Sequence, residues 1–446
     1  MGVSRLVGLT GDTIAALATP GGAGGIGILR VSGPEALAVG ERIFRPARAW
    51  AGTMGRAWPA RRLVLGRAVD PADGQEIDEV LAVYFPAPHS YTTQATVEIQ
   101  GHGGPAVMRR LLEAALAAGC RLARPGEFTW RAFVGGRLDL AQAEAVGALV
   151  AAQSRAEARL ALAGLAGGLG ARLEPVRESL LGAAARVEAA LDFPEDLAAL
   201  DAAALASDLR RGALEPLESL LGERARRRVF QEGALVVLCG RPNVGKSSLF
   251  NALLGRRRAL VSAQPGTTRD LLEEPLVVGG VRVCLVDTAG LGTGGPEVEE
   301  AGREMARERL GQAELCLVVL DGGQVMQAED WEVLAATEWS PRLLVVNKAD
   351  KAPAWEPQEL DAPFLCVSAH TGQGLEDLLA ALGQALTGGL PEPAPGEALA
   401  NARQAEAFVR VRGAVERALA ALGLVDGRSA PDEVIEAAFA NFCLGK

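Results

Sequence analysis

Residues 240–247 constrain this sequence more than any other segment, because they read Gly-x-x-x-x-Gly-Lys-Ser between an apolar run and a helical pattern. The apolar run at 234–239 predicts a buried strand, and the helical pattern begins at Ser248. In that context the backbone N–H groups of the loop face phosphate oxygens, Lys246 reaches the β- and γ-phosphates, and the Ser247 hydroxyl is a ligand for Mg²⁺. The segment therefore predicts an α/β domain that binds a nucleoside triphosphate.

A second motif, Asn347-Lys348-Ala349-Asp350, follows the predicted strand 343–346 and selects the base. Asp350 can accept hydrogen bonds from N1–H and the 2-amino group of guanine, and adenine offers neither donor. Lys348 lays its stem along the base, and the Ser368-Ala369 loop supplies a backbone N–H to guanine O6. The nucleotide is therefore predicted to be GTP rather than ATP.

Two further motifs complete the nucleotide site. Asp287-Thr288-Ala289-Gly290 follows the predicted strand 281–286, so that Asp287 holds Mg²⁺ through water and the Gly290 N–H senses the γ-phosphate. Thr268 supplies a second hydroxyl to Mg²⁺ when its segment orders. The residues predicted to bind GTP are Asn243, Val244, Gly245, Lys246, Ser247, Ser248, Ser262, Ala263, Gln264, Pro265, Gly266, Thr267, Thr268, Asp287, Thr288, Ala289, Gly290, Asn347, Lys348, Ala349, Asp350, Ser368, Ala369 and His370.

The residue that follows the Asp-Thr-Ala-Gly motif is Leu291, where many signalling GTPases have a glutamine that orients the attacking water. Leucine cannot do this, so hydrolysis needs another group to position water and another positive charge for the transition state. Glu297, Glu299 and Glu300 are all within reach as the water-positioning group. Asn243 is either an ordinary loop residue or a ligand for a monovalent cation near the β–γ bridge.

The rest of the chain divides by composition. Before residue 123, short apolar runs at 26–31, 79–85 and 95–100 predict strands, and 107–118 predicts a helix. From 124 to 228 the sequence is rich in Ala, Leu, Glu and Arg, and 138–166 is expected to form one long helix.

Strands alternate with helices from 234 to 386, which is typical of a parallel sheet. The predicted strands are 234–239, 281–286, 315–320, 343–346 and 364–367. A Pro- and Gly-containing linker at 388–396 then leads to a helical segment at 398–422. The last ~60 residues are too few for a core of their own and resemble 124–228 in composition. We therefore expect one helical domain, made from both segments and interrupted by the α/β domain.

The charge, the hydrophobic pattern and the cysteines of the whole chain exclude several classes of protein. The formal net charge of −10 argues against broad nonspecific nucleic-acid binding. No apolar run approaches the ~20 residues of a membrane span, and the first ten residues do not read as a secretory signal. The six cysteines lack paired spacing, and Cys239, Cys284, Cys316 and Cys366 lie in apolar runs, so they are expected to be buried thiols in the cytoplasm.

Only four of the 45 basic residues are lysines: Lys246, Lys348, Lys351 and Lys446. Lysine and arginine are not interchangeable where a compact ammonium is required. The remaining lysines are therefore candidates for positions that exclude arginine.

Three other features of the sequence have alternative interpretations. Residues 22–27 read Gly-x-Gly-x-x-Gly, but they lead into a predicted strand, which excludes a dinucleotide fingerprint and indicates a turn. His102, between glycines, is either a loop histidine or a catalytic base. Cys443, close to the carboxy terminus, belongs either to a frayed tail or to a functional one.

Several segments together carry a family resemblance. They are Ala18-Thr19-Pro20, residues 25–33, residues 100–105, residues 123–129, residues 138–145, the GTPase motifs and the ending Cys443-Leu444-Gly445-Lys446. On these segments the chain resembles the tRNA-modification GTPase family MnmE, also called TrmE.

The resemblance implies a multidomain α/β fold. It consists of an α+β folate-binding and dimerisation domain (1–122), an all-α helical domain split in sequence (123–230 and 387–446), and an inserted Ras-like P-loop GTPase domain (231–386). The implied protein is a homodimer that acts with the flavoprotein MnmG/GidA, which carries FAD. The pair would place a carboxymethylaminomethyl group at C5 of the wobble uridine (U34) of certain tRNAs. The one-carbon donor would be 5,10-methylenetetrahydrofolate or 5-formyltetrahydrofolate.

The resemblance also implies roles for individual residues. Arg30, Glu98, Arg137 and Lys446 match the folate contacts, although the family usually has lysine in place of Arg137. K⁺ would be held by Asn243, Ser262, Gln264 and Thr267, and Mg²⁺ by Ser247 and Thr268. Glu299 matches the glutamate that orients water, and Cys443 matches a tail cysteine of the modification chemistry, as nucleophile or acid. Gly292 stands where the family often has arginine.

A rival interpretation is a switch GTPase of the Era type, active in ribosome assembly or signalling. Such a chain would carry an RNA-binding domain with a basic surface. This sequence has instead the N-terminal glycine block and the Cys-x-Gly-Lys ending.

Overall fold

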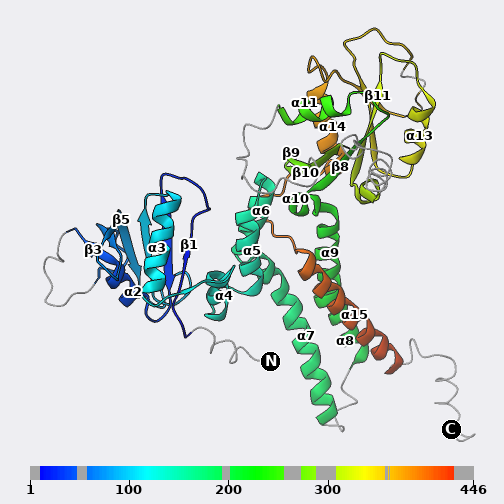
Figure 1. Cartoon of the computed structure of the whole chain (residues 1–446). Coiled ribbons are helices and arrows are strands. Elements are labelled where there is room, and N and C mark those ends of the chain that lie inside the picture. The colour runs from blue at the N-terminus through cyan, green and yellow to red at the C-terminus, as the bar shows by residue number, and fades with distance from the viewer. Residues whose placement is uncertain are drawn as a thin grey trace, which may run out of the picture. The chain divides into compact units, whose positions relative to one another are not determined.

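The computed structural model describes residues 11–47, 58–192, 201–255, 273–287, 308–356, 360 and 362–425. The chain forms two compact units, Met1–Gly147 and Ala148–Lys446, and their elements are labelled in Figure 1. No helix among these residues is both long enough and apolar enough to cross a membrane.

The first unit contains a seven-stranded sheet in the order β3-β4-β5-β6-β2-β1-β7. All neighbouring strands are antiparallel except β1 and β7. The strands are β1 (Ile14–Leu17), β2 (Gly27–Ser32), β3 (Phe44–Pro46), β4 (Val64–Val69), β5 (Glu76–Phe85), β6 (Thr96–Gly101) and β7 (Arg121–Leu122). The three longer strands predicted from the sequence are confirmed as β2, β5 and β6.

Alternation along the strands separates a core face from an outer face. Val97 and Ile99 of β6 are fully buried in the core that the sheet forms with α2 (Ala36–Ile43) and α3 (Pro105–Ala117) (Figure 1). Because successive side chains point to opposite faces, Glu98 lies on the outer face, directly across from Arg30 of β2. The register of two central strands therefore brings two predicted folate residues together.

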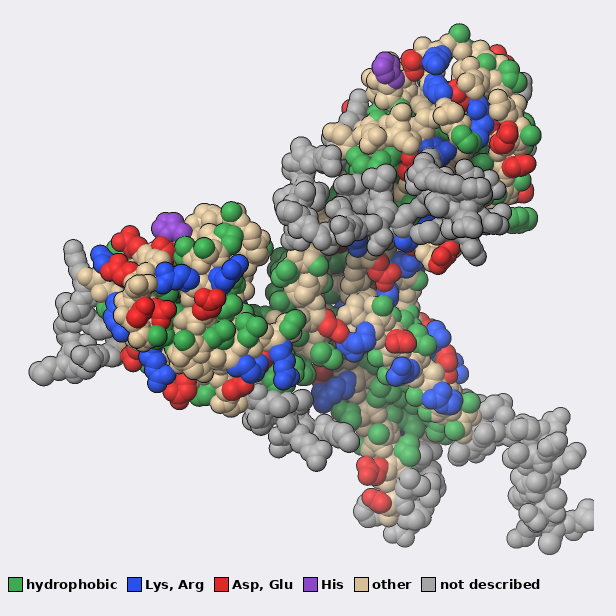
Figure 2. Space-filling view, viewed as in Figure 1, with side chains coloured by type: hydrophobic (Ala, Val, Ile, Leu, Met, Phe, Trp, Pro, Cys, Tyr) green, Lys and Arg blue, Asp and Glu red, His purple; other side chains and the backbone are tan. Residues whose placement is uncertain are grey.

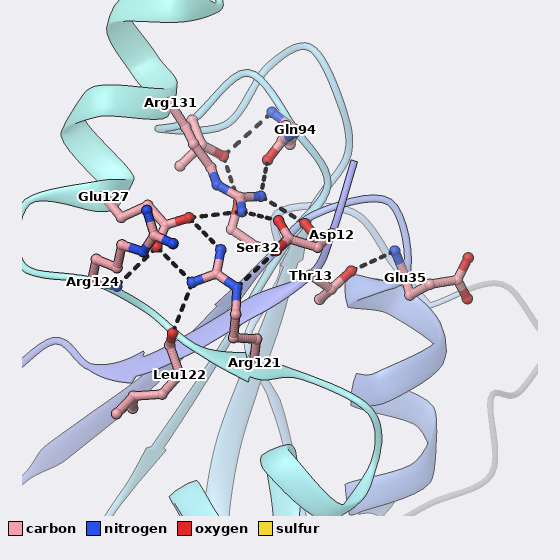
Figure 3. A network of polar contacts seen from close by, with 11 residues as sticks. Asp12, Thr13, Ser32, Glu35, Gln94, Arg121, Leu122, Arg124, Glu127 and Arg131 are labelled. Atoms are coloured by element: carbon pink, nitrogen blue, oxygen red, sulfur yellow. Dashed lines mark hydrogen bonds and ion pairs between the residues drawn. The ribbon is translucent and has the colours of Figure 1, made fainter. Parts of the chain in front are cut away.

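A network of charged side chains, of which Glu127 and Arg131 are buried, connects helix α4 (Glu127–Val134) to the start of β1 (Figure 3). The side chain of Arg131 is 0% exposed and donates to Glu127 (3.0 Å), to the Asp12 carboxylate (2.5 Å) and to the Asp12 carbonyl (2.7 Å). Arg121 of β7 bonds both Glu127 oxygens, at 2.7 and 3.0 Å, and also Asp12. Two arginines and two carboxylates are thus paired with one another, as the buried Arg131 and Glu127 require.

The second unit contains a helical bundle that both predicted helical segments build. Its core is formed by α7 (Gly168–Asp192), α8 (Ala202–Leu209), the π-helical turn η2 (Arg210–Leu214), α9 (Glu215–Arg227) and α15 (Ala402–Val425). Phe408 and Val415 of α15 are buried in the same core as Leu205 and Leu217, and α15 runs beside α8 and α9 (Figure 1). The expected helical domain split in sequence is confirmed.

The single helix expected at 138–166 is wrong. The structure has two helices, α5 (Leu140–Ala151) and α6 (Arg155–Leu165). Ser154 between them is extended, at φ −120° and ψ 160°, and its hydroxyl accepts from the Glu157 N–H at 3.1 Å. The Glu157 carboxylate accepts from the backbone of Gln153 and Ser154, which completes a capping box. The Ser-x-x-Glu signal was present in the sequence but was masked by the surrounding alanines and leucines.

The α/β part of the second unit is a six-stranded sheet in the order β13-β12-β11-β8-β10-β9. It is parallel except for the edge strand β9. The strands are β8 (Ala234–Cys239), β9 (Glu273–Val278), β10 (Val281–Asp287), β11 (Leu315–Asp321), β12 (Arg342–Asn347) and β13 (Phe364–Cys366). The described helices around it are α11 (Lys246–Gly255), α13 (Ala328–Ala336) and α14 (Leu375–Thr387), with the short α10 (Val229–Glu232) before β8. The five predicted strands are confirmed to within one residue at each end.

The cysteines only partly follow the prediction. Cys239 and Cys316 are buried on the central strands β8 and β11. Cys284 is half-buried, and Cys366 is exposed because it ends the edge strand β13. The prediction of burial is therefore wrong for Cys366, whose apolar run lies at the margin of the sheet.

The network around Glu127 should make the first unit sensitive to acid. Its hydrogen bonds with Arg121 hold the pKa of Glu127 at about 2, below the ordinary 4.5. The ionised carboxylate therefore stabilises the fold above pH 4.5, and this contribution is lost as the pH falls towards 2. Glu127→Gln should cost about 3 kcal/mol at pH 7. Hydrogen exchange of α4 and β1 amides should then rise on the order of 100-fold.

The exposed Glu113 on α3 provides the control, since Glu113→Gln removes the same charge without touching the network. The difference in amide exchange rate between wild type and Glu127→Gln should be smaller at pH 3.5 than at pH 7. An equal difference at both pH values would contradict the conclusion that the ionised Glu127 carboxylate stabilises the first unit.

Candidate functional site

The phosphate loop joins β8 to α11 and needs glycine at two positions. Gly240 and Gly245 have φ of 153° and 98°, in the region that side chains rarely adopt. A Cβ at Gly245 would lie 2.3 Å from the Asn347 Nδ2 atom, and one at Gly240 would lie 2.4 Å from the Val319 carbonyl oxygen. The close packing of this loop against β11 and β12 therefore explains the motif's glycines.

Lys246 is held inside the curve of this loop. Its side chain is buried, and Nζ donates to the carbonyl oxygens of Gly240 at 2.7 Å and Arg241 at 2.9 Å. Burial lowers the pKa of the Lys246 ammonium, while the Asp287 carboxylate opposes that shift. A positive charge is thus placed where the loop would wrap phosphates.

Ser247 and Asp287 meet at the carboxyl ends of β8 and β10. The Ser247 hydroxyl donates to Asp287 Oδ2 at 2.6 Å, and Asp287 is buried. A hydroxyl and a carboxylate beside a phosphate loop are the oxygen donors that Mg²⁺ takes together with phosphates and water. These two residues fit the ion, and Thr268 lies outside the described residues.

The base-selecting carboxylate is fixed by a neighbouring loop. The fully buried Ser368 donates its hydroxyl to Asp350 Oδ1 at 2.5 Å and accepts from the Thr371 N–H at 3.1 Å. The hydrogen bond from Ser368 is the main reason that the pKa of Asp350 is lowered. Asp350 is exposed, and its carboxylate can accept hydrogen bonds from a guanine edge.

Asn347 and Lys348 connect the phosphate loop to the loops that would hold the base. Asn347 Nδ2 donates to the Val244 carbonyl at 2.9 Å, and its Oδ1 accepts from the Ala369 N–H at 3.1 Å. Lys348 Nζ donates to the Asn243 carbonyl at 2.9 Å and to Asp321 at 2.6 Å. The motif residues are therefore brought together into one frame.

Two residues of this frame were not identified from the sequence. Asp321 ends β11 and pairs with Lys348, and its position at the carboxyl end of a parallel strand could have revealed it. Arg241, in the phosphate loop, is buried and pairs with Asp330 of α13 at 2.9 Å and with Gln324 at 2.9 Å. No local pattern predicts that second pairing.

The structure places seventeen of the predicted site residues. They are Arg30, Glu98, Arg137, Asn243, Val244, Gly245, Lys246, Ser247, Ser248, Asp287, Asn347, Lys348, Asp350 and Ser368, with Ala349, Ala369 and His370 on the same loops as their neighbours. The other predicted residues lie outside the described ranges. They are Ser262, Ala263, Gln264, Pro265, Gly266, Thr267, Thr268, Thr288, Ala289, Gly290, Glu299, Cys443 and Lys446.

The first unit carries a cavity of about 590 Å³ on the outer face of its sheet. Glu98 lines it and accepts from Arg30 Nε at 2.7 Å. Arg137, also lining it, lies over the Tyr91 ring at 4.8 Å and donates to the Tyr91 carbonyl at 2.9 Å. The Arg30 guanidinium lies over Tyr91 and over Phe128 of α4, at 5.5 and 5.6 Å. Three of the four predicted folate residues are thus brought together around an aromatic ring.

This cavity fits a reduced folate by its chemistry. Aromatic and guanidinium planes suit a flat ring system, and a carboxylate suits its N–H donors. The glycine segment 22–27 leads into β2, so the rejection of a dinucleotide fingerprint is confirmed. His102 is exposed and does not line the cavity, and its hydrogen bond with Asp78, at 2.8 Å, raises the pKa of the imidazole.

Known proteins resemble this chain over nearly its whole length. Residues 13–137 match the family model described as the GTP-binding protein TrmE N-terminus, and residues 140–443 match the MnmE helical domain. A Thermus thermophilus protein named tRNA modification GTPase MnmE is 42% identical over 98% of this chain and 99% of its own length. A Symbiobacterium thermophilum protein of the same name is 43% identical over 98% of this chain and 99% of its own length. Among solved structures, the G domain of the T. maritima FeoB iron transporter covers 34% of this chain and 98% of its own, at 28% identity and a TM-score of 0.26.

Replacing Asp350 with Asn should change the base preference. An amide donates where the carboxylate accepted, so guanine loses its hydrogen bonds while xanthine gains a partner at its 2-oxo group. We expect GDP affinity to fall by at least about 100-fold, or roughly 3 kcal/mol, and xanthosine diphosphate to bind in its place. Fluorescent nucleotide titration measures both.

Lys351→Gln is the matched control, because Lys351 is exposed one residue further along the same loop. Undiminished GDP binding by Asp350→Asn would show that another residue selects the base.

Proposed function

Since the chain belongs to the MnmE family of tRNA modification GTPases, we propose that it is a potassium-activated GTP hydrolase acting with a flavoprotein on wobble uridine. The flavoprotein would be MnmG/GidA with FAD, and the product a carboxymethylaminomethyl group at C5 of U34 in certain tRNAs. The main support for the proposal is that one chain carries both a guanine-selecting site, with Asp350 held by Ser368, and a cavity lined by Glu98, which pairs with Arg30.

Potassium activation is supported by the conformation of Asn243. Its backbone is left-handed, at φ 65°, and its carbonyl is taken by Lys348 Nζ. Within the described residues no hydrogen bond occupies its exposed side-chain amide, whose oxygen suits a monovalent cation. Ser262, Gln264 and Thr267 would complete the K⁺ site. The bound ion would supply transition-state charge, and Glu299 would orient water in place of the glutamine that Leu291 excludes.

A reduced one-carbon folate is the proposed donor, as 5,10-methylenetetrahydrofolate or 5-formyltetrahydrofolate. Glu98 would accept from the N–H groups of the pterin, Arg30 would hold Glu98, and Arg137 would contribute from the cavity rim. Lys446 and Cys443 would approach with the carboxy-terminal tail. Arg137, where the family usually has lysine, keeps the positive charge and adds stacking on Tyr91.

Homodimerisation through the folate-binding domain is supported by an apolar strip on its sheet. Leu65 of β4 pairs with Leu81 of β5, and they are 49% and 38% exposed. Leu63, just before β4, is 55% exposed. Exposed leucines on neighbouring strands are typical of a surface that another chain covers.

The proposed domains are 1–122, 123–230 with 387–446, and 231–386. The first boundary follows β7, which ends at Leu122, and the last lies beside the end of α14 at Thr387. The five described cysteines form no disulfide, which supports a cytoplasmic location. Figure 2 shows Lys and Arg side chains interspersed with Asp and Glu over the visible face. Recognition of tRNA would therefore use local contacts or the flavoprotein rather than a broad cationic surface.

Asn243→Gly should abolish potassium stimulation while sparing nucleotide binding. Glycine keeps the left-handed backbone, so the loss isolates the side-chain oxygen better than Asn243→Ala does. GTP hydrolysis in KCl should fall to the rate seen in NaCl, by about 10-fold or more. GDP affinity should change less than about 3-fold. Stimulation that survives in both variants would rule out Asn243 as the ion's ligand.

A deletion strain tests the modification itself. Mass spectrometry of its tRNA nucleosides should show wobble uridine without the carboxymethylaminomethyl group, restored by the wild-type gene. Asp287→Asn, which removes a Mg²⁺-site carboxylate, should not restore it. Intact modification in the deletion strain would favour a switch GTPase of the Era type.

A further inference from the structure

The cavity of the first unit changes from buried to exposed along its length. Thr96 is 1% exposed, and Glu98 is 16% exposed and paired with Arg30. Three other lining residues, Arg61, His89 and Arg137, are exposed to solvent and form the rim of the cavity. A ligand with one flat, apolar end and one charged end would therefore place its charged end at this rim.

The rim carries uncompensated positive charge. Among the described residues that line the cavity, Glu98 alone is acidic, and its partner is Arg30. Neither Arg61 nor Arg137 forms an ion pair with any carboxylate in the described part of the chain. Two guanidinium groups without counter-charges attract an anion, and the guanidinium fork matches a carboxylate.

Arg61 is anchored by its backbone, so that its side chain is available to a ligand. Its N–H donates to the Tyr84 carbonyl at 2.7 Å, and its φ of 57° is left-handed, which is uncommon for a residue other than glycine. One Nη atom donates to the His89 carbonyl at 3.2 Å. An arginine has five N–H donors, so most of them remain to bind a ligand.

We propose that Arg61, together with Arg137, forms a subsite for the glutamate carboxylates of the folate bound in this cavity. The inference rests on the proposed folate function and assigns the orientation of the ligand, with the pterin at Glu98 and the glutamate tail at the rim. Further γ-linked glutamates would bring additional carboxylates within reach of the Arg61 and Arg137 guanidinium groups, so the subsite favours folates that carry them.

Titration calorimetry of the full-length protein with two ligands tests this subsite. One is 5-formyltetrahydrofolate, and the other is the same compound with its glutamate replaced by a neutral methylamide. Arg61→Gln should weaken binding of the glutamate form about 5- to 10-fold and leave the methylamide form unchanged. Arg61→Lys, which keeps the charge without the fork, should fall between wild type and Arg61→Gln.

Arg62→Gln is the control, because Arg62 is the exposed neighbour that does not line the cavity. It should change neither affinity, and thermal unfolding should be the same for all variants. A triglutamate form should bind wild type more tightly than the monoglutamate, and this preference should disappear in Arg61→Gln.

The outcomes separate this inference from the proposed function. If wild type binds neither ligand, folate binding itself is wrong and the subsite fails with it. If Arg30→Ala loses both ligands but Arg61→Gln binds both as wild type does, folate binding stands and the subsite is overturned. Equal losses for both ligands in Arg61→Gln would also overturn it, because Arg61 would then act on the pterin end or on the cavity itself.

Discussion

The nucleotide frame depends on one side chain, the amide of Asn347. It is 2% exposed, and it bonds the Val244 carbonyl in the phosphate loop and the Ala369 N–H in the base loop. Because Gly245 packs against the same amide, a larger residue in the loop would displace it. Without the amide, two backbone groups would lose their partners at a cost of about 1–3 kcal/mol each. The two halves of the site are therefore positioned relative to each other before a nucleotide binds.

A buried arginine paired with a carboxylate serves the same purpose in both units. Arg131 secures α4, whose Phe128 lies beside Arg30, and Arg241 secures the phosphate loop to Asp330 of α13. Such pairs add little net stability compared with apolar packing, but losing one partner leaves a buried charge. Their effect is therefore to fix one arrangement of the segments that carry the functional residues.

The sequence predicted those parts of the molecule whose signals are local. The parallel sheet and its loops follow from apolar runs that end in motif residues, so β8 was predicted to the residue and β12 to within one residue at each end. The break at Ser154 was missed because a capping box is a weak signal inside an alanine-rich stretch. The folate residues were predicted only through the family resemblance, and Arg61, Tyr91 and Phe128 were not identified, because they come from separate segments. Contacts between residues so far apart in the sequence are determined by packing, and they produce no periodic pattern in the sequence.

Two of the four lysines belong to the nucleotide site, and their contacts explain why these positions keep lysine in a chain that otherwise uses arginine. Lys246 and Lys348 each direct a single ammonium at two acceptors within 3 Å, and at least one acceptor of each is a backbone carbonyl of the phosphate loop. A planar guanidinium would present five donors there and leave some unpaired. The cavity of the first unit has the opposite requirement. There the guanidinium groups of Arg30 and Arg137 both lie over the Tyr91 ring, and planar cations stack on it in a way that an ammonium does not. The choice between lysine and arginine therefore follows the geometry of each site. Arginine at position 137, where the family usually has lysine, suits a site in which cations stack on an aromatic ring.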